Sequence, residues 1–148
     1  MKAYLTFTKK GLLLIVAALV CITLICGEIY VAGNQNTNAA TNAERLRFIE
    51  NIIGCSIISD KPSAKMVTIP ETFSDVYVNY NSLQKSAGYD LTLYKGCEVT
   101  VYTYGINPPQ NYSGECVCNL IVYNDRVIGG DISSVALGGF MLPIKKQI

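Results

Sequence analysis

The hydrophobic and polar positions divide the chain into an apolar N-terminal segment, a short polar stretch and a mixed remainder. Residues 11–32 are apolar or small apart from Thr23, Glu28 and Tyr30, and a helix of roughly 20 such residues can span a bilayer. Three lysines lie in residues 1–10, and no Lys or Arg follows until Arg45. The positive-inside rule then predicts a cytoplasmic N-terminus over 1–10 and a transmembrane signal-anchor helix over 11–32, with the rest of the chain outside the cell membrane.

A cleaved signal peptide is the competing interpretation of this segment. Its apolar core would be long, because such cores usually span about 7 to 15 residues. The sequence Val31-Ala32-Gly33 offers a weak cleavage site. Cleavage there would make the remaining domain a secreted protein instead of a membrane-tethered one.

Small and polar residues over 33–40 are typical of a flexible linker, and 41–148 is long enough for one domain. Thr41 and Glu44 form a capping-box pattern, and apolar residues then recur at helical spacing up to Gly54. We therefore predict a first helix over 42–53. A second helix is predicted from a cap at Thr72 to a stop at Gly88, and its expected apolar face consists of Phe73, Val76, Tyr77, Tyr80, Leu83 and Ala87.

Alternating and β-branched residues predict strands over 97–104, 115–123 and 127–132, with shorter candidates at 55–58 and 66–69. A tight turn is expected at 124–126, and Gly129-Gly130 indicates a bulge or a close neighbour. The tail over 135–148 either packs on the sheet or frays. These elements predict an α+β fold, in which two helices pack on an antiparallel β-meander of three or more strands.

Charge and composition exclude several classes of function. Beyond Gly33 the chain has nine Lys or Arg and ten Asp or Glu, so no basic surface for nucleic acid is expected. The chain has no His, which removes His-assisted nucleophilic catalysis and His-ligated metals. We expect no catalytic activity, no cofactor and no metal site.

Four cysteines lie in the predicted domain, and an extracytoplasmic location would permit disulfides. Cys116 and Cys118 share one face of a strand at about 6.5 Å or more, which is too far for a disulfide between them. Cys55 and Cys97 are the other two cysteines. Two alternatives remain open: either all four are free buried thiols, or two of them form one disulfide. A four-cysteine metal site lacks the usual Cys-x-x-Cys spacing.

Tyr102, Tyr104 and Asp131 are the candidate interaction residues. A tyrosine-rich surface suits recognition of a peptide or sugar, although strands also favour Tyr and bury its ring. Asp131 follows two glycines that could expose the backbone to a partner, and a structural hydrogen-bonding role is the alternative.

The combined sequence at 73–85, 88–91, 94–96, 101–104, 120–124, 126–131 and 139–141 resembles an uncharacterised domain-of-unknown-function family of Clostridia-like Gram-positive bacteria. The resemblance covers roughly 43–141, although Asn124-Asp125 and Gly138-Gly139 depart from the Asn-Gly and Asp-Gly of the family pattern. It implies a membrane-anchored small extracytoplasmic domain, and it implies no activity or functional residues.

The sequence thus favours a membrane-tethered, extracytoplasmic interaction or regulatory module that binds a protein or peptide at the cell surface. Pairing of a strand edge with an extended peptide is its simplest mechanism. The alternatives are a structural accessory subunit of a membrane complex and, least favoured, an enzyme that uses carboxylate or thiol groups.

Overall fold

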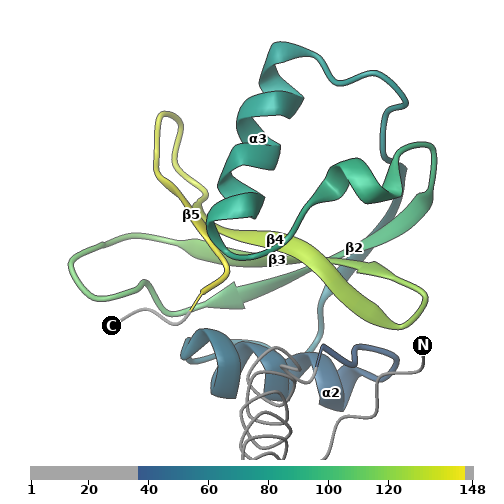
Figure 1. The fold of residues 1–148 in the computed structure, drawn as a ribbon. Coiled ribbons are helices and arrows are strands. Elements are labelled where there is room, and N and C mark those ends of the chain that lie inside the picture. The colour runs from purple at the N-terminus through teal and green to yellow at the C-terminus, as the bar shows by residue number, and fades with distance from the viewer. Residues whose placement is uncertain (1–36, 146–148) are drawn as a thin grey trace, which may run out of the picture. The chain divides into compact units, whose positions relative to one another are not determined.

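The computed structural model describes residues 37–145 of the chain, so the segment predicted to span the membrane, 11–32, lies outside the described residues. The described part is a five-stranded antiparallel sheet with helices on both faces (Figure 1). Within 37–145, no helix is long and apolar enough to cross a membrane. The predicted α+β class with two helices and an antiparallel meander is confirmed for this part of the chain.

The sheet has the order β1-β2-β3-β4-β5, and every neighbouring pair is antiparallel. The second helix, α3, lies in the connection between β1 and β2, together with the short 3₁₀ helix η2. In chain order the elements are α2 (Asn42–Arg47), the π-helical η1 (Phe48–Ile53), β1 (Ser63–Thr68), α3 (Asp75–Ser86), η2 (Leu91–Tyr94), β2 (Glu98–Ile106), β3 (Cys116–Tyr123), β4 (Arg126–Ser134) and β5 (Met141–Pro143).

The first helix has the predicted ends. The Thr41 hydroxyl accepts a bond from the Glu44 backbone N–H at 3.2 Å, and the Glu44 carboxylate accepts one from the Thr41 N–H at 2.9 Å. Gly54 ends the helix in the left-handed conformation, with φ of 81°. The second half of this helix winds with π-type bonds, such as that from the Gly54 N–H to the Ile49 carbonyl at 2.9 Å, which the sequence pattern did not predict.

The second helix begins later than predicted. Ser74, not Thr72, is its cap, because the Ser74 hydroxyl is the one that accepts from the Tyr77 N–H, at 3.5 Å. Val76 was expected on the apolar face but is 78% exposed, whereas the polar Asn81 and Gln84 are buried. The prediction failed there because this helix meets the sheet partly through hydrogen bonds, such as that from the Gly130 N–H to Gln84 Oε1 at 2.8 Å.

The N-terminal end of the domain differs from the sequence prediction, whereas the tail takes one of its two predicted forms and packs on the sheet. The last residues of the predicted linker 33–40 belong to the folded domain, since Ala39 is 1% exposed and its N–H donates to the Asp125 carbonyl. The tail adds β5 to the sheet beside β4. The candidate strand at 55–58 is reduced to one bridge between Ile57 and Ile106, while β1 begins three residues before the predicted 66–69.

The predicted tight turn connects β3 to β4 and makes them a hairpin. Asn124 and Asp125 both have positive φ, at 45° and 61°, as a two-residue type I′ turn requires. Gly129 and Gly130 have close neighbours, as predicted, because a Cβ on Gly130 would collide with the Asn119 carbonyl oxygen and one on Gly129 would lie 2.8 Å from Gln84 Oε1.

Side chains alternate between two faces of the sheet, which we call the α2 face and the α3 face after the helix that covers each one (Figure 1). In β2, Tyr104 and Ile106 point to the α2 face, whereas Val99 and Val101 point to the α3 face. The core of the α2 face is the larger, and it includes Phe48, Ile49 and Ile53 from η1.

Candidate functional site

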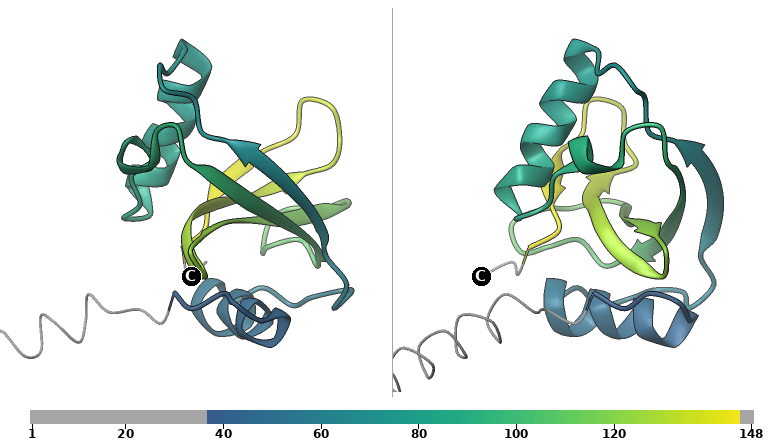
Figure 2. Two further views of the ribbon diagram at one scale, coloured as in Figure 1. Left: turned by 90° about the vertical axis from the view of Figure 1, so that its right-hand side faces the viewer. Right: turned by 45° about the vertical axis from the view of Figure 1, so that its right-hand side comes forward.

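A groove of about 420 Å³ lies on the α3 face. Side chains from β1, β2, β3 and β4 form its floor, and Tyr77 and Tyr80 of α3 form its wall. The helix α3 packs mainly against β4, β5 and η2, and its main contacts include neither β1 nor β2. In Figure 2, α3 stands beside β5 while β1 lies at the opposite edge of the sheet.

A row of polar side chains crosses the floor of the groove from strand to strand. Ser63 pairs with Thr103, Thr103 with Asn119, and Asn119 with Asp131, so the four residues stand on one rung of the sheet. The Thr103 hydroxyl donates to Asn119 Oδ1 at 2.7 Å, and Asn119 Nδ2 donates to Asp131 Oδ2 at 2.9 Å. Such a continuous chain of bonds holds each polar group in one orientation.

Asp131 ends this row as a buried carboxylate. It is 3% exposed, and the Tyr80 hydroxyl of α3 donates to its Oδ1 at 2.9 Å. Burial, and then the charge of Asp131 and this bond, raise the pKa of Tyr80 above its usual range, so Tyr80 stays a protonated donor. Among residues 37–145, no Lys or Arg forms an ion pair with Asp131.

The rest of the groove is apolar, apart from one charge at its open end. Val67, Val99, Val101 and Ile121 contribute aliphatic side chains to the floor. Lys65 is exposed on the edge strand β1 and lines the same groove. Three strand spacings of about 4.8 Å separate β1 from β4, and Lys65 lies two residues along the strand from Ser63, which shares the rung of Asp131, so the Cα atoms of Lys65 and Asp131 lie roughly 16 Å apart.

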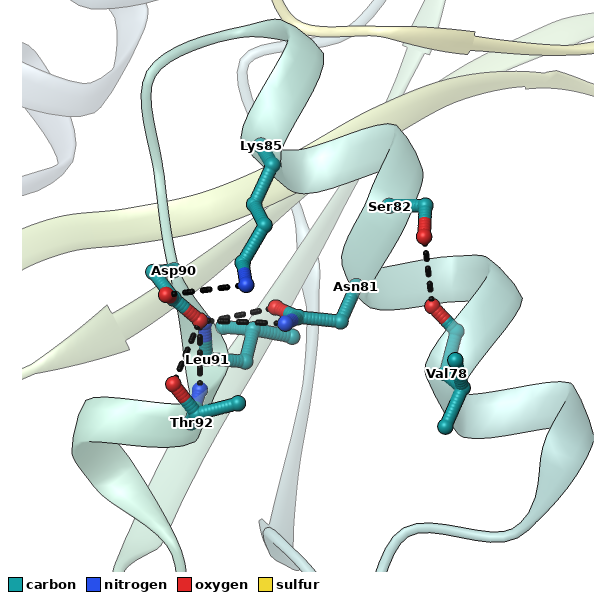
Figure 3. A network of polar contacts seen from close by, with 7 residues as sticks. All are labelled: Val78, Asn81, Ser82, Lys85, Asp90, Leu91 and Thr92. Carbon is teal, nitrogen blue, oxygen red and sulfur yellow. Dashed lines mark hydrogen bonds and ion pairs between the residues drawn. The ribbon is translucent and has the colours of Figure 1, made fainter.

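A polar clamp fixes the end of the helix that forms the wall (Figure 3). Asp90 Oδ1 accepts from the Thr92 hydroxyl at 2.7 Å, the Thr92 N–H at 3.0 Å and Asn81 Nδ2 at 3.0 Å, and Lys85 Nζ lies 3.3 Å from Oδ2. Asn81 Oδ1 in turn accepts from the Leu91 N–H at 2.7 Å. The bonds from Thr92, and then that from Asn81, hold the pKa of Asp90 well below its usual range.

Tyr102 and Tyr104 do not join Asp131 in the groove. Both point to the α2 face, where Tyr104 is fully buried and its hydroxyl donates to Asn42 Oδ1 at 2.7 Å and accepts from Arg45 Nε at 2.9 Å. The Arg45 guanidinium also stacks 3.8 Å above the Tyr102 ring centre. The structure therefore separates the predicted interaction residues, because successive side chains of a strand point to opposite faces.

Sequence reasoning missed Tyr80, Asn119, Thr103 and Lys65 as members of the same site as Asp131. The available signal was a polar residue within each apolar strand, at Thr103 and Asn119. Thr103 and Asn119 can be recognised as neighbours only when the register between their strands is known. Tyr80 bonds to Asp131, which lies 51 positions later in the sequence.

None of the four cysteines of the domain lines the groove, although Cys97 packs against the hydrophobic cluster of the α3 face. All four are free thiols in the structure, and Cys55, Cys116 and Cys118 belong to the core of the α2 face. Burial raises the pKa of each of these three thiols, which disfavours the reactive thiolate. Cys116 and Asp131 point to opposite faces of the sheet, so a site that combines this thiol with the carboxylate is not formed.

The fold and the groove define the class of this part of the chain: an α+β domain with one closed sheet face and one grooved sheet face. Residues 57–132 match the family described as Domain of unknown function (DUF4830), and the chain belongs to that family. Comparisons with curated proteins and with solved structures gave no match. The family match contains every residue that lines the groove, whereas α2 and η1 precede it.

Proposed function

We propose that the chain is a non-catalytic binding module that holds a segment of a partner polypeptide in the groove beneath α3. The groove supports this proposal most directly, since it combines aliphatic side chains on its floor with a few fixed polar groups, as binding sites generally do. Its volume of about 420 Å³ suits a few residues of extended chain better than a whole protein surface.

The module is, in this proposal, tethered to the outer side of a cell membrane by residues 11–32. The support is the apolar segment itself and the three lysines that precede it. A reporter enzyme active only outside the cytoplasm, fused after Ile148, tests the orientation. N-terminal sequencing of the mature protein tests the tether, because a new terminus near Asn34 would show a secreted domain instead.

Binding in the groove is tested with the full chain in membrane nanodiscs and a library of short extended peptides. Val67→Trp fills the groove at its open end, and Met66→Trp places the same bulk on the opposite side of β1, where Met66 is 63% exposed. We expect Val67→Trp to weaken the binding of selected peptides by about tenfold or more, and Met66→Trp to change it by less than about twofold. Failure to select any peptide, or equal effects of the two variants, would reject the proposal.

A second mode of binding is strand addition along β1. This strand is an edge of the sheet, and within residues 37–145 its backbone forms no ladder with any strand but β2. N-methylation of a selected peptide separates the two modes, since a paired strand loses affinity only when methyl groups fall on alternate backbone nitrogens. Loss of affinity without that alternation would leave groove binding as the mode.

A further inference from the structure

We infer that the groove selects a peptide with one basic side chain, Lys or Arg, directed at Asp131. This inference deepens the proposed function and rests on it, since the basic group is carried by the polypeptide that fills the groove. The inference begins from the charge of Asp131, a carboxylate that is 3% exposed and lines the groove on β4, three strands from the edge strand β1.

The polar neighbours of Asp131 leave its charge without a cationic partner. Its two bonded partners, Tyr80 and Asn119, are neutral donors, and each occupies a different carboxylate oxygen. An ionised carboxylate can accept about four hydrogen bonds, so capacity for further donors remains. Burial of an unpaired charge is costly, and a cationic donor from a ligand offsets that cost more strongly than a neutral one.

No described cation of the chain reaches Asp131. Lys65 is the one basic residue that lines the groove, and it stands on β1, three strand spacings and two residues along the strand from Asp131, or roughly 16 Å away between Cα atoms. A lysine side chain is too short to cover that distance. Since no basic residue within 37–145 supplies the opposite charge, the bound partner supplies it.

The two ends of the groove differ in charge, and this sets the orientation of the partner. An extended chain advances about 3.3 Å per residue, so four residues span about 10 Å between their first and last Cα atoms, and long side chains at both ends cover the rest of the distance from Lys65 to Asp131. A basic residue at the inner end, an acidic one at the outer end, and aliphatic residues between them match Asp131, Lys65 and the valines of the floor. A strand added outside β1 would lie one spacing further away, and its side chains would not reach Asp131.

The test uses a matched pair of peptides and the full chain in nanodiscs. The probe is acetyl-Arg-Val-Ile-Glu-amide, and its partner carries citrulline, which has the shape of Arg without the charge. We expect the citrulline peptide to bind about tenfold or more weakly, measured by fluorescence anisotropy of labelled peptides or by NMR titration. Both peptides are measured against the same unchanged protein, so a difference in their affinities cannot arise from a folding defect of a variant.

Two protein variants locate the effect. Asp131→Asn should remove most of the preference for Arg over citrulline, while Lys65→Gln should weaken only peptides that end in Glu, by about twofold to threefold, and not those that end in Gln. Circular dichroism checks that Asp131→Asn is folded.

The outcomes separate the inference from the proposed function. If the Arg and citrulline peptides bind equally, and Val67→Trp weakens both, the groove binds peptides but the inference is wrong. A preference for Arg that persists in folded Asp131→Asn would also overturn it, because the cation would then lie elsewhere. If library peptides bind in the groove and the Arg probe does not, the inference is again rejected.

Discussion

The two faces of the sheet are built from the same strands but are covered to different extents. On the α2 face, Phe48, Ile49 and Ile53 from η1 meet Tyr104 and its neighbours in a core with fully buried large side chains. On the α3 face, the helix covers one side of the sheet and leaves a groove whose floor carries a polar row. Alternation in one set of strands thus produces a closed face for stability and an open face available for binding.

The two faces also differ in how fully their buried polar groups are hydrogen-bonded. Buried polar groups on the α2 face are satisfied internally, as Arg45, Tyr104 and Asn42 show. On the α3 face, the Asp131 charge is only partly compensated. Substitutions on the α2 face should therefore change stability, whereas some substitutions on the α3 face should change binding more than stability.

The largest expected effect comes from Phe48→Ala on the α2 face. The side chain is 2% exposed, so its loss should lower the free energy of unfolding by about 3–5 kcal/mol through lost burial and a cavity. Tyr77→Ala, on the half-buried wall of the groove, should cost roughly 1 kcal/mol. Urea denaturation of the full chain measures both, and equal losses would remove the distinction between the faces.

A smaller effect is expected for Gly130→Ala, in the strand that serves both faces. The new Cβ would collide with the Asn119 carbonyl oxygen, and relief of that contact should cost about 1–3 kcal/mol. Gly105→Ala is the matched control, since the nearest atom to its Cβ would be 4.0 Å away. A stable Gly130→Ala variant would show that β3 and β4 can separate here without loss.

Tyr104→Phe should cost about 1–3 kcal/mol, because it leaves Arg45 Nε and Asn42 Oδ1 without a partner in a buried site. Binding of groove peptides to the folded variant should be unchanged. Tyr80→Phe is the counterpart on the α3 face, where it removes a donor to Asp131 and should alter peptide affinity as well. An effect of Tyr104→Phe on affinity would contradict the separation of the two faces.

Asp90→Asn should have the smallest effect and a distinct pH dependence. The folded-state pKa of Asp90 is below the unfolded value of about 3.9, so its contribution is present above that pH and is lost as the pH falls through the folded-state pKa. Melting temperatures of the wild type and Asp90→Asn should differ slightly at pH 7 and converge in acid. Asp60→Asn, at an exposed position, is the control. A constant difference down to pH 2 would show that the clamp acts without the charge.

Local signals predicted much of the fold. The capping box at Thr41 and the stop at Gly54 located the first helix, and the Asn124-Asp125 turn located the hairpin between β3 and β4. Elements that depend on distant partners were predicted less well. β5 needs β4 beside it, and the buried face of α3 is set by a bond between Gln84 and Gly130.

The candidate site was only partly predictable for the same reason. The position of Asp131 after two glycines indicates it as a candidate, but Tyr102 and Tyr104, the other candidate interaction residues, lie on the α2 face. A shift of one position, from Tyr102 to Thr103, exchanges one face of the sheet for the other. Sequence alone gives the alternation along each strand, while the register across strands comes from the assembled sheet.

The contacts of residues 37–39 have a mechanical consequence. The Val127 N–H donates to the Thr37 carbonyl and the Ala39 N–H donates to the Asp125 carbonyl, each at 2.8 Å, which pins the chain to the tip of the β3–β4 hairpin. A pulling force transmitted along the backbone from the N-terminal side would load these two bonds first. These two bonds would break first under tension, so residues 37–39 would detach from the hairpin before the force reached the strands beneath the groove.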